Sequence, residues 1–135
     1  MQIQFGGFYF NNGLRIQLNP KNNPKNMDIL MQLEMIKGKS GVLVIKNLVV
    51  DEETHPEDLS VYFEDDNYLL MLLDYDDEGC IDVRTANNEH ASKGEFQNIL
   101  GEPYVATTIV QDFEIVKKCF IEFNQTGNVS RDLLN

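Results

Sequence analysis

The chain has 135 residues, 42% of them hydrophobic, which suits one packed domain over residues 1–135 and excludes a disordered chain. Its formal net charge of −11 argues against nucleic acid or an anionic membrane as a partner, because binding either one relies on exposed Lys and Arg. No apolar run is long enough to span a membrane, and the first residues lack the basic and apolar regions of a signal peptide, so we expect a cytoplasmic protein.

The N-terminal residues predict a β-hairpin. Residues 3–10 alternate around a Gly-Gly pair, which indicates a strand with a glycine bulge or bend. An Asn-Gly turn then returns the chain as a second strand over residues 14–18. Further along, the β-branched residues of 42–50 predict an inner strand.

Between these strands the pattern predicts a helix that ends near residue 37. Asn23 is placed as its N-cap and Pro24 as its first residue, where the missing N–H of proline is tolerated. Its wheel carries two apolar stripes, and the second consists of Met27, Met31 and Met35. We expect these methionines to be buried under the sheet; a partly exposed interface is the alternative.

The middle of the chain predicts a meander of three strands over residues 59–63, 68–73 and 81–83. The second strand is apolar almost throughout, so we expect it to lie centrally and to be covered on both faces. A short helix over 94–100 and a strand over 103–110 follow.

A final helix is capped by Asp112 and ends near Gly127. Short hairpin connections favour antiparallel pairing. The fold class is therefore α+β, a mostly antiparallel sheet with two main helices packed against it.

Acidic residues are concentrated in one segment. Residues 51–78 hold twelve Asp and Glu and no Lys or Arg, while the rest of the chain sums to +1. If the strands pair as a meander, residues 64–66 and 74–78 lie at opposite ends of the central strand, roughly 20 Å apart. The loop over 51–58 is expected near the second of these turns. A broad negative surface best suits a large basic partner, although an acidic run can also serve solubility alone.

Residues 74–82 match part of a calcium-binding loop. Oxygen-bearing side chains stand at positions 1, 3, 5 and 9, and Gly79 stands at position 6. Position 12 is Thr85 where a bidentate Glu is needed, and strands are predicted on both sides where helices are needed. We therefore predict an acidic turn without a metal, and calcium binding is the less favoured interpretation.

The sequence has no pattern that indicates catalysis. His55 and His90 have no Ser or Cys placed beside them for a nucleophilic site. Phosphate-binding glycine loops and metal-binding Cys or His motifs are also missing from the sequence. We expect a protein that is not an enzyme and that uses no cofactor.

Residues 120–134, F-I-E-F-N-Q-T-G-N-V-S-R-D-L-L, resemble an F-x-E-F-x-x-T-G-x-V-S-x-D-L-L tail that follows a helix in small bacterial proteins of the uncharacterised and immunity type. The opening residues 5–8 and the segment 67–70 are similar to them too. Size, domain count and acidity are also similar to immunity proteins of contact-dependent growth inhibition systems. That resemblance implies binding and neutralisation of the toxin domain of a neighbouring cell's secreted protein.

No binding residue carries over from the resemblance, so the candidate site rests on charge. Many such toxins are nucleases, which must be cationic to hold their substrate. The predicted partner-binding residues are Asp51, Glu52, Glu53, Glu57, Asp58, Asp74, Asp76, Asp77 and Glu78. The alternative is a non-enzymatic interaction module with another partner, or a self-assembling homo-oligomer.

Overall fold

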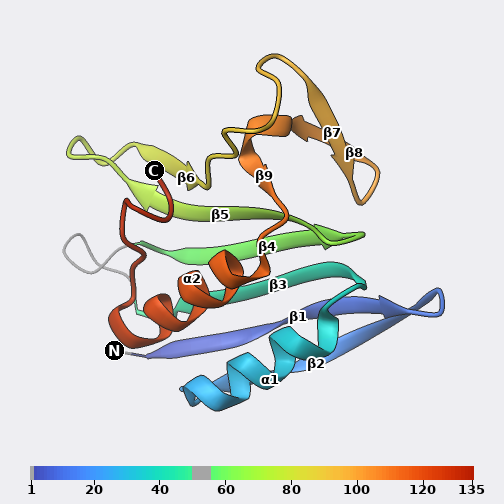
Figure 1. Cartoon of the computed structure of the whole chain (residues 1–135). Coiled ribbons are helices and arrows are strands. Elements are labelled where there is room, and N and C mark those ends of the chain that lie inside the picture. Colours follow the sequence, from blue (N-terminus) through green and yellow to red (C-terminus); the bar gives the residue numbers. More distant parts are fainter. Residues whose placement is uncertain (1, 50–55) are drawn as a thin grey trace.

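Nine strands and two helices make up the part of the chain that the computed structural model describes, residues 2–49 and 56–135. The strands are β1 (Ile3–Asn11), β2 (Leu14–Asn22), β3 (Ser40–Asn47), β4 (Asp58–Glu64), β5 (Asn67–Tyr75), β6 (Ile81–Thr85), β7 (Phe96–Ile99), β8 (Glu102–Val105) and β9 (Ile109–Val110). The helices are α1 (Asn26–Ile36) and α2 (Phe113–Thr126), with a 3-10 turn at Ala106–Thr108. This arrangement confirms the predicted α+β fold (Figure 1).

The main sheet has the strand order β2-β1-β3-β4-β5-β6, and every neighbouring pair is antiparallel. β9 adds to one end of β5, while β7 and β8 form a separate hairpin. The predicted first hairpin and the three-strand meander are both confirmed. Asn12 and Gly13 have φ of 52° and 78°, the positive values that a two-residue hairpin turn requires.

The predicted glycine bulge in β1 is also confirmed. The register between β1 and β2 shifts between Phe5 and Gly7, and Gly7 has a φ of 136°. A Cβ atom at Gly7 would lie 2.2 Å from the carbonyl oxygen of Val42 on β3. Only glycine allows the backbones of β1 and β3 to approach this closely.

Both helices cover the same face of the sheet, and the main core lies between them and the strands (Figure 1). Each helix buries one stripe there: Ile29, Leu33 and Ile36 from α1, and Val116, Cys119, Phe120 and Phe123 from α2. The ring of Phe120 meets that of Phe5 edge-on, with centroids 6.1 Å apart. Burial of these stripes is what holds the helices on the sheet.

The final helix has the predicted ends. The Asp112 carboxylate accepts a hydrogen bond of 3.0 Å from the Glu114 N–H, as an N-cap does. At the other end Gly127 is left-handed, with a φ of 75°, and its N–H donates to the Phe123 carbonyl.

The predicted start of the first helix is wrong by about two residues. Its N-cap is Lys25, because β2 continues to Asn22 and Asn23 closes the strand ladder. The Asn23 side-chain oxygen accepts from the Ile3 N–H at 3.0 Å, and the Asn23 N–H donates to the Ile3 carbonyl. An asparagine that tolerates its φ of 50° is therefore used as a turn residue and not as a cap.

The predicted short helix over residues 94–100 is also wrong. These residues contribute β7, which pairs with β8 through a tight turn at Leu100 and Gly101. Both turn residues have positive φ, 53° and 83°. Consequently the strand predicted over 103–110 is divided, because β8 pairs with β7 and β9 pairs with β5.

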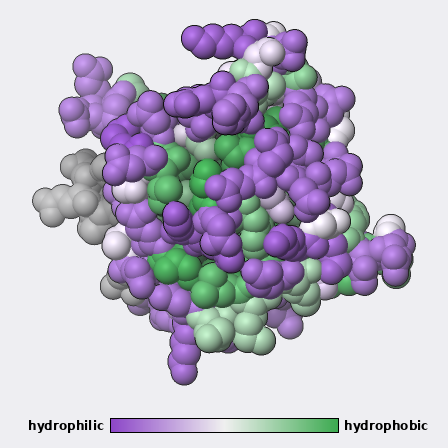
Figure 2. All heavy atoms as spheres, in the orientation of Figure 1, coloured by the Kyte–Doolittle hydropathy of each residue, from purple (hydrophilic) through white to green (hydrophobic). Residues whose placement is uncertain are grey.

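Burial of the methionine stripe is contradicted by the structure. Met27, Met31 and Met35 are 64%, 66% and 42% exposed, because the other stripe of α1 already fills the space against the sheet. Figure 2 shows the side of the molecule that carries the helices, where a light green patch lies over α1 among mostly hydrophilic atoms. The alternative interpretation, an exposed methionine surface, is the one that the structure supports.

Candidate functional site: an acidic edge of the sheet

Six of the nine predicted partner-binding residues lie in the described part of the chain. Asp51, Glu52 and Glu53 lie outside it. The other six belong to the start of β4, the end of β5 and the turn between β5 and β6. Antiparallel pairing of β4 with β5 brings the first two of these segments to the same end of the sheet.

Direct contacts join the start of β4 to the end of β5. The Glu57 N–H donates to the Leu73 carbonyl at 2.9 Å, and Asp58 is paired with Leu73. The Tyr75 hydroxyl donates to the Glu57 carboxylate at 2.7 Å. For residues 57 and 58, the predicted proximity of the 51–58 loop to the second acidic turn is therefore confirmed.

The turn between β5 and β6 is organised by one aspartate. The Asp76 carboxylate accepts hydrogen bonds of 2.9 Å from the N–H groups of Glu78 and Cys80. Gly79 provides the positive φ of 81° that closes the turn. Asp77 and Glu78 are exposed, so their carboxylates reach the solvent. We call Glu57, Asp58, Asp76, Asp77 and Glu78 the acidic edge.

Asp58 is the member of the acidic edge whose ionisation is made unfavourable by its surroundings. Partial burial raises the pKa of the Asp58 carboxyl, the nearby Glu57 raises this pKa further, and Lys46 on the neighbouring strand lowers it. The Tyr75 hydroxyl has a raised pKa because it donates to the Glu57 carboxylate. Burial and the charge of Glu57 therefore outweigh the favourable effect of Lys46, and negative charge is unfavourable at Asp58.

Asp74 was predicted to be a partner-binding residue, but it does not belong to this exposed surface. Its side chain is 10% exposed and forms an ion pair of 3.2 Å with Arg84 on β6. Arg84 also donates to the carbonyl oxygens of Leu134, at 3.1 and 2.8 Å, and of Val129, at 2.7 Å. The pair therefore holds the C-terminal tail against the sheet, and the tail on which the family resemblance rests has a structural role.

Residues 64–66 form the other acidic turn, at the opposite end of β5, as predicted. Asp65 and Asp66 make the tight turn between β4 and β5 with φ of 51° and 62°. Glu64 accepts a hydrogen bond of 3.3 Å from the Leu100 N–H of the β7–β8 hairpin. The two acidic turns cannot act as one compact site.

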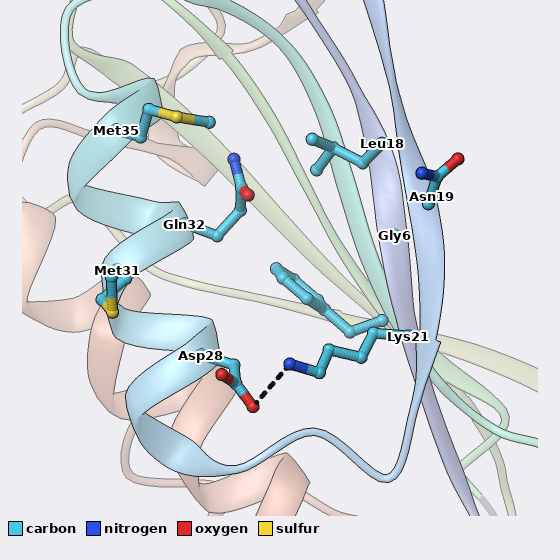
Figure 3. A pocket seen from close by; sticks show the side chains of 9 residues that line it. Gly6, Leu18, Asn19, Lys21, Asp28, Met31, Gln32 and Met35 are labelled. Atoms are coloured by element: carbon cyan, nitrogen blue, oxygen red, sulfur yellow. Dashed lines mark ion pairs between the residues drawn. The ribbon is translucent and has the colours of Figure 1, made fainter.

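A groove of about 380 Å³ between α1 and the β1–β2 hairpin was missed by the sequence interpretation. Figure 3 shows Met35 on the helix pointing toward Leu18 on the strand, with a Lys21–Asp28 ion pair of 3.0 Å at one end, and Met31 also lines the groove. The Gln32 side chain points between the two walls. Its amide nitrogen is buried and has no hydrogen-bond partner in the described part of the molecule. The sequence signal for this groove was the methionine stripe, in its alternative interpretation as a partly exposed interface.

Residues 2–49 and 56–135 provide neither a cluster of metal ligands nor a membrane-spanning helix. No group of three or more His, Cys, Asp and Glu side chains there is arranged to hold a metal ion. Among the same residues, neither helix is long and apolar enough to cross a membrane.

Comparison with known proteins places the chain in a family without assigning it an activity. The model of a "Family of unknown function (DUF6911)" matches residues 2–133. The chain is also similar to a solved structure, a hypothetical protein from Neisseria gonorrhoeae, with 29% sequence identity and a TM-score of 0.81. That similarity covers 96% of this chain and 90% of the Neisseria chain. None of the curated proteins matches this sequence.

Proposed function

The chain belongs to the DUF6911 family of unknown function, and we propose that this member is an immunity protein that binds and neutralises a cognate basic toxin domain. One observation carries the proposal: the fold gathers the carboxylates of the acidic edge at one end of the sheet. Such a surface attracts a cationic protein and repels nucleic acid and anionic lipid.

A nuclease toxin is the kind of partner that the acidic edge fits best. A nuclease needs Lys and Arg around its active site to hold phosphates, and a protein that covers these cations competes with the substrate. The proposed mechanism is binding alone, without catalysis, metal or cofactor. Its proposed location is the cytoplasm, where an incoming toxin domain meets its target.

The test measures association of the purified protein with a toxin domain encoded beside its gene. We expect the association rate to fall steeply as NaCl rises, because exposed charge pairs are screened over about 8–10 Å at physiological ionic strength. The variant D76N/D77N/E78Q should associate about tenfold more slowly at low salt, since it loses three of the five charges of the acidic edge.

The matched control is E64Q/D65N/D66N, which removes three charges at the other end of β5. Amide side chains keep the acceptor oxygens that Glu64 and Asp76 use, so both variants should fold. The control should associate nearly as fast as the unmodified protein. The immunity proposal would be rejected if the toxin domain encoded beside the gene is not bound. It would also be rejected if binding is the same at all salt concentrations and in both variants.

A second candidate function is an interaction module that uses the groove beside α1. The exposure of Met31 and Met35 favours it, and so does the Gln32 amide nitrogen, which has no hydrogen-bond partner among the described residues. Flexible thioethers suit surfaces that bind a partner or a second copy of the chain. Sedimentation at increasing concentration tests the homo-oligomer: M27Q/M31Q/M35Q should abolish any concentration-dependent dimer, and a dimer that survives in this variant would exclude the α1 face.

A further inference from the structure

Four apolar side chains form a patch on the face of the sheet that points away from the helices. β5 and β6 pair Leu73 with Val83 and Tyr75 with Ile81. Ile81 is 67% and Val83 49% exposed, while Leu73 and Tyr75 are half-buried. Their neighbours Leu72 and Arg84 point to the helix side and are buried. We call Leu73, Tyr75, Ile81 and Val83 the outer patch.

Within residues 2–49 and 56–135, the fold leaves the outer patch open to solvent. Further along β5 the same face is covered, because Leu69 is buried in a small cluster with Ile99 and Ile109 next to the β7–β8 hairpin. This cover does not extend to β6, the last strand of the main sheet. Edge strands usually carry Lys or other charges on exposed positions to prevent association, whereas β6 carries Ile and Val there.

The acidic edge borders the outer patch directly. Asp58 lies in the same cross-strand row as Leu73 and Val83, and Glu57 is bound by the Tyr75 hydroxyl. The remaining three carboxylates belong to the turn that connects Tyr75 to Ile81. An apolar centre is thus bordered by five carboxylates, which is the complement of an apolar side chain surrounded by Lys and Arg.

We propose that the outer patch is the central contact for a basic protein partner that inserts an apolar side chain between surrounding Lys and Arg. This inference rests on the proposed function and names its contact surface. The acidic edge then sets the association rate, because long-range attraction acts before contact. The outer patch sets the dissociation rate, because a desolvated apolar centre supplies most of the affinity of an interface.

Two synthetic nonapeptides of equal charge test the outer patch without any toxin. One alternates Lys with Val and the other alternates Lys with Ser, each with five Lys. At about 20 mM NaCl we expect the Lys-Val peptide to bind about tenfold more tightly than the Lys-Ser peptide, measured by calorimetry. Backbone amide shifts in NMR should change at residues 73–83 when the Lys-Val peptide is added.

The variant I81T/V83T removes apolar surface but keeps the β-branched shape that strands favour. It should reduce affinity for the Lys-Val peptide to that for the Lys-Ser peptide. The control V105T changes a valine of similar exposure, 43%, on β8, and should leave both affinities unchanged. D76N/D77N/E78Q should weaken binding of both peptides by a similar factor.

The inference would be overturned if the two peptides bind with equal affinity or if neither peptide binds. It would also be overturned if I81T/V83T binds the Lys-Val peptide as tightly as the unmodified protein does. These outcomes are separate from those of the toxin experiment. A protein that binds the Lys-Val peptide at the outer patch but no toxin would retain this surface and lose the immunity proposal. A toxin that binds the acidic edge and is bound equally well by I81T/V83T would retain the immunity proposal and exclude the outer patch as its contact surface.

Discussion

Arg84 connects the end of β5 and the C-terminal tail to β6. Its guanidinium pairs with Asp74 and binds two carbonyl oxygens of the tail, all in a buried environment. Removing one partner of such a pair leaves an uncompensated charge inside the protein. Arg84→Met should therefore reduce the free energy of unfolding by about 3–5 kcal/mol, measured by urea denaturation.

Arg131→Met is the matched control for Arg84→Met. The Arg131 side chain is 64% exposed and lies 4.0 Å from Asp82, so its loss should change stability by less than about 0.5 kcal/mol. Equal losses in the two variants would mean that the buried network does not stabilise the tail.

Asp58 should make stability depend on pH in a specific direction. Its folded-state pKa is raised, so the folded protein binds a proton more tightly here than the unfolded chain does. The unfavourable effect is complete above the folded pKa and disappears below the ordinary value of 3.8. Asp58→Asn should therefore raise the urea midpoint at pH 7 and leave it unchanged near pH 3. A lower midpoint at pH 7 would show that the Asp58 carboxylate is stabilised and not repelled.

At the level of elements, α1 carries a polar group whose cost can be measured. The Gln32 amide nitrogen is buried without a partner in the described structure, and such a group destabilises a protein by about 1–3 kcal/mol. Gln32→Leu should therefore increase the free energy of unfolding by about 1 kcal/mol. Gln125→Leu, at an exposed position of α2, is the control and should have almost no effect. A loss of stability in Gln32→Leu would mean that water or a ligand satisfies the amide in solution.

Elements with strong local signals could be predicted from the sequence. The Asn12-Gly13 turn and the Asp112 and Gly127 caps depend on residues next to one another in the chain, and all three were confirmed. The β7–β8 hairpin was missed because its turn, Leu100-Gly101, has no typical hairpin residue at its first position. The start of α1 was misplaced because Asn23 bonds to Ile3, a contact twenty residues away.

In the candidate site, too, local features could be predicted from the sequence and long-range contacts could not. Charge counting identified the acidic segments, and pairing of predicted strands was enough to separate the two turns. Burial of Asp74 could not be predicted, because its partner Arg84 is fixed by a tail some fifty residues further along. The outer patch was missed because the apolar run 68–73 predicts a strand covered on both faces, whereas the structure covers its outer face only in part.

Over the whole molecule, charge is divided along the sheet. Residues 1–49 contain six Lys and Arg and two acids, whereas residues 56–135 contain five Lys and Arg and seventeen acids. Because β1 to β3 occupy one half of the main sheet and β4 to β6 the other, the protein is positive at one side and strongly negative at the other. If the proposed function is right, this charge distribution orients a basic partner toward the acidic edge before contact.

The same charge distribution should destabilise the folded state at low ionic strength. The carboxylates of the acidic edge repel one another, and raising NaCl from about 10 to 200 mM shortens the screening length from about 30 Å to below 10 Å. We expect the melting temperature to rise by several degrees over this range, measured by circular dichroism. D76N/D77N/E78Q should melt higher than the unmodified protein at 10 mM NaCl and respond less to salt, because three repelling charges are gone. An unchanged salt response in this variant would mean that the repulsion arises elsewhere in the acidic half of the sheet.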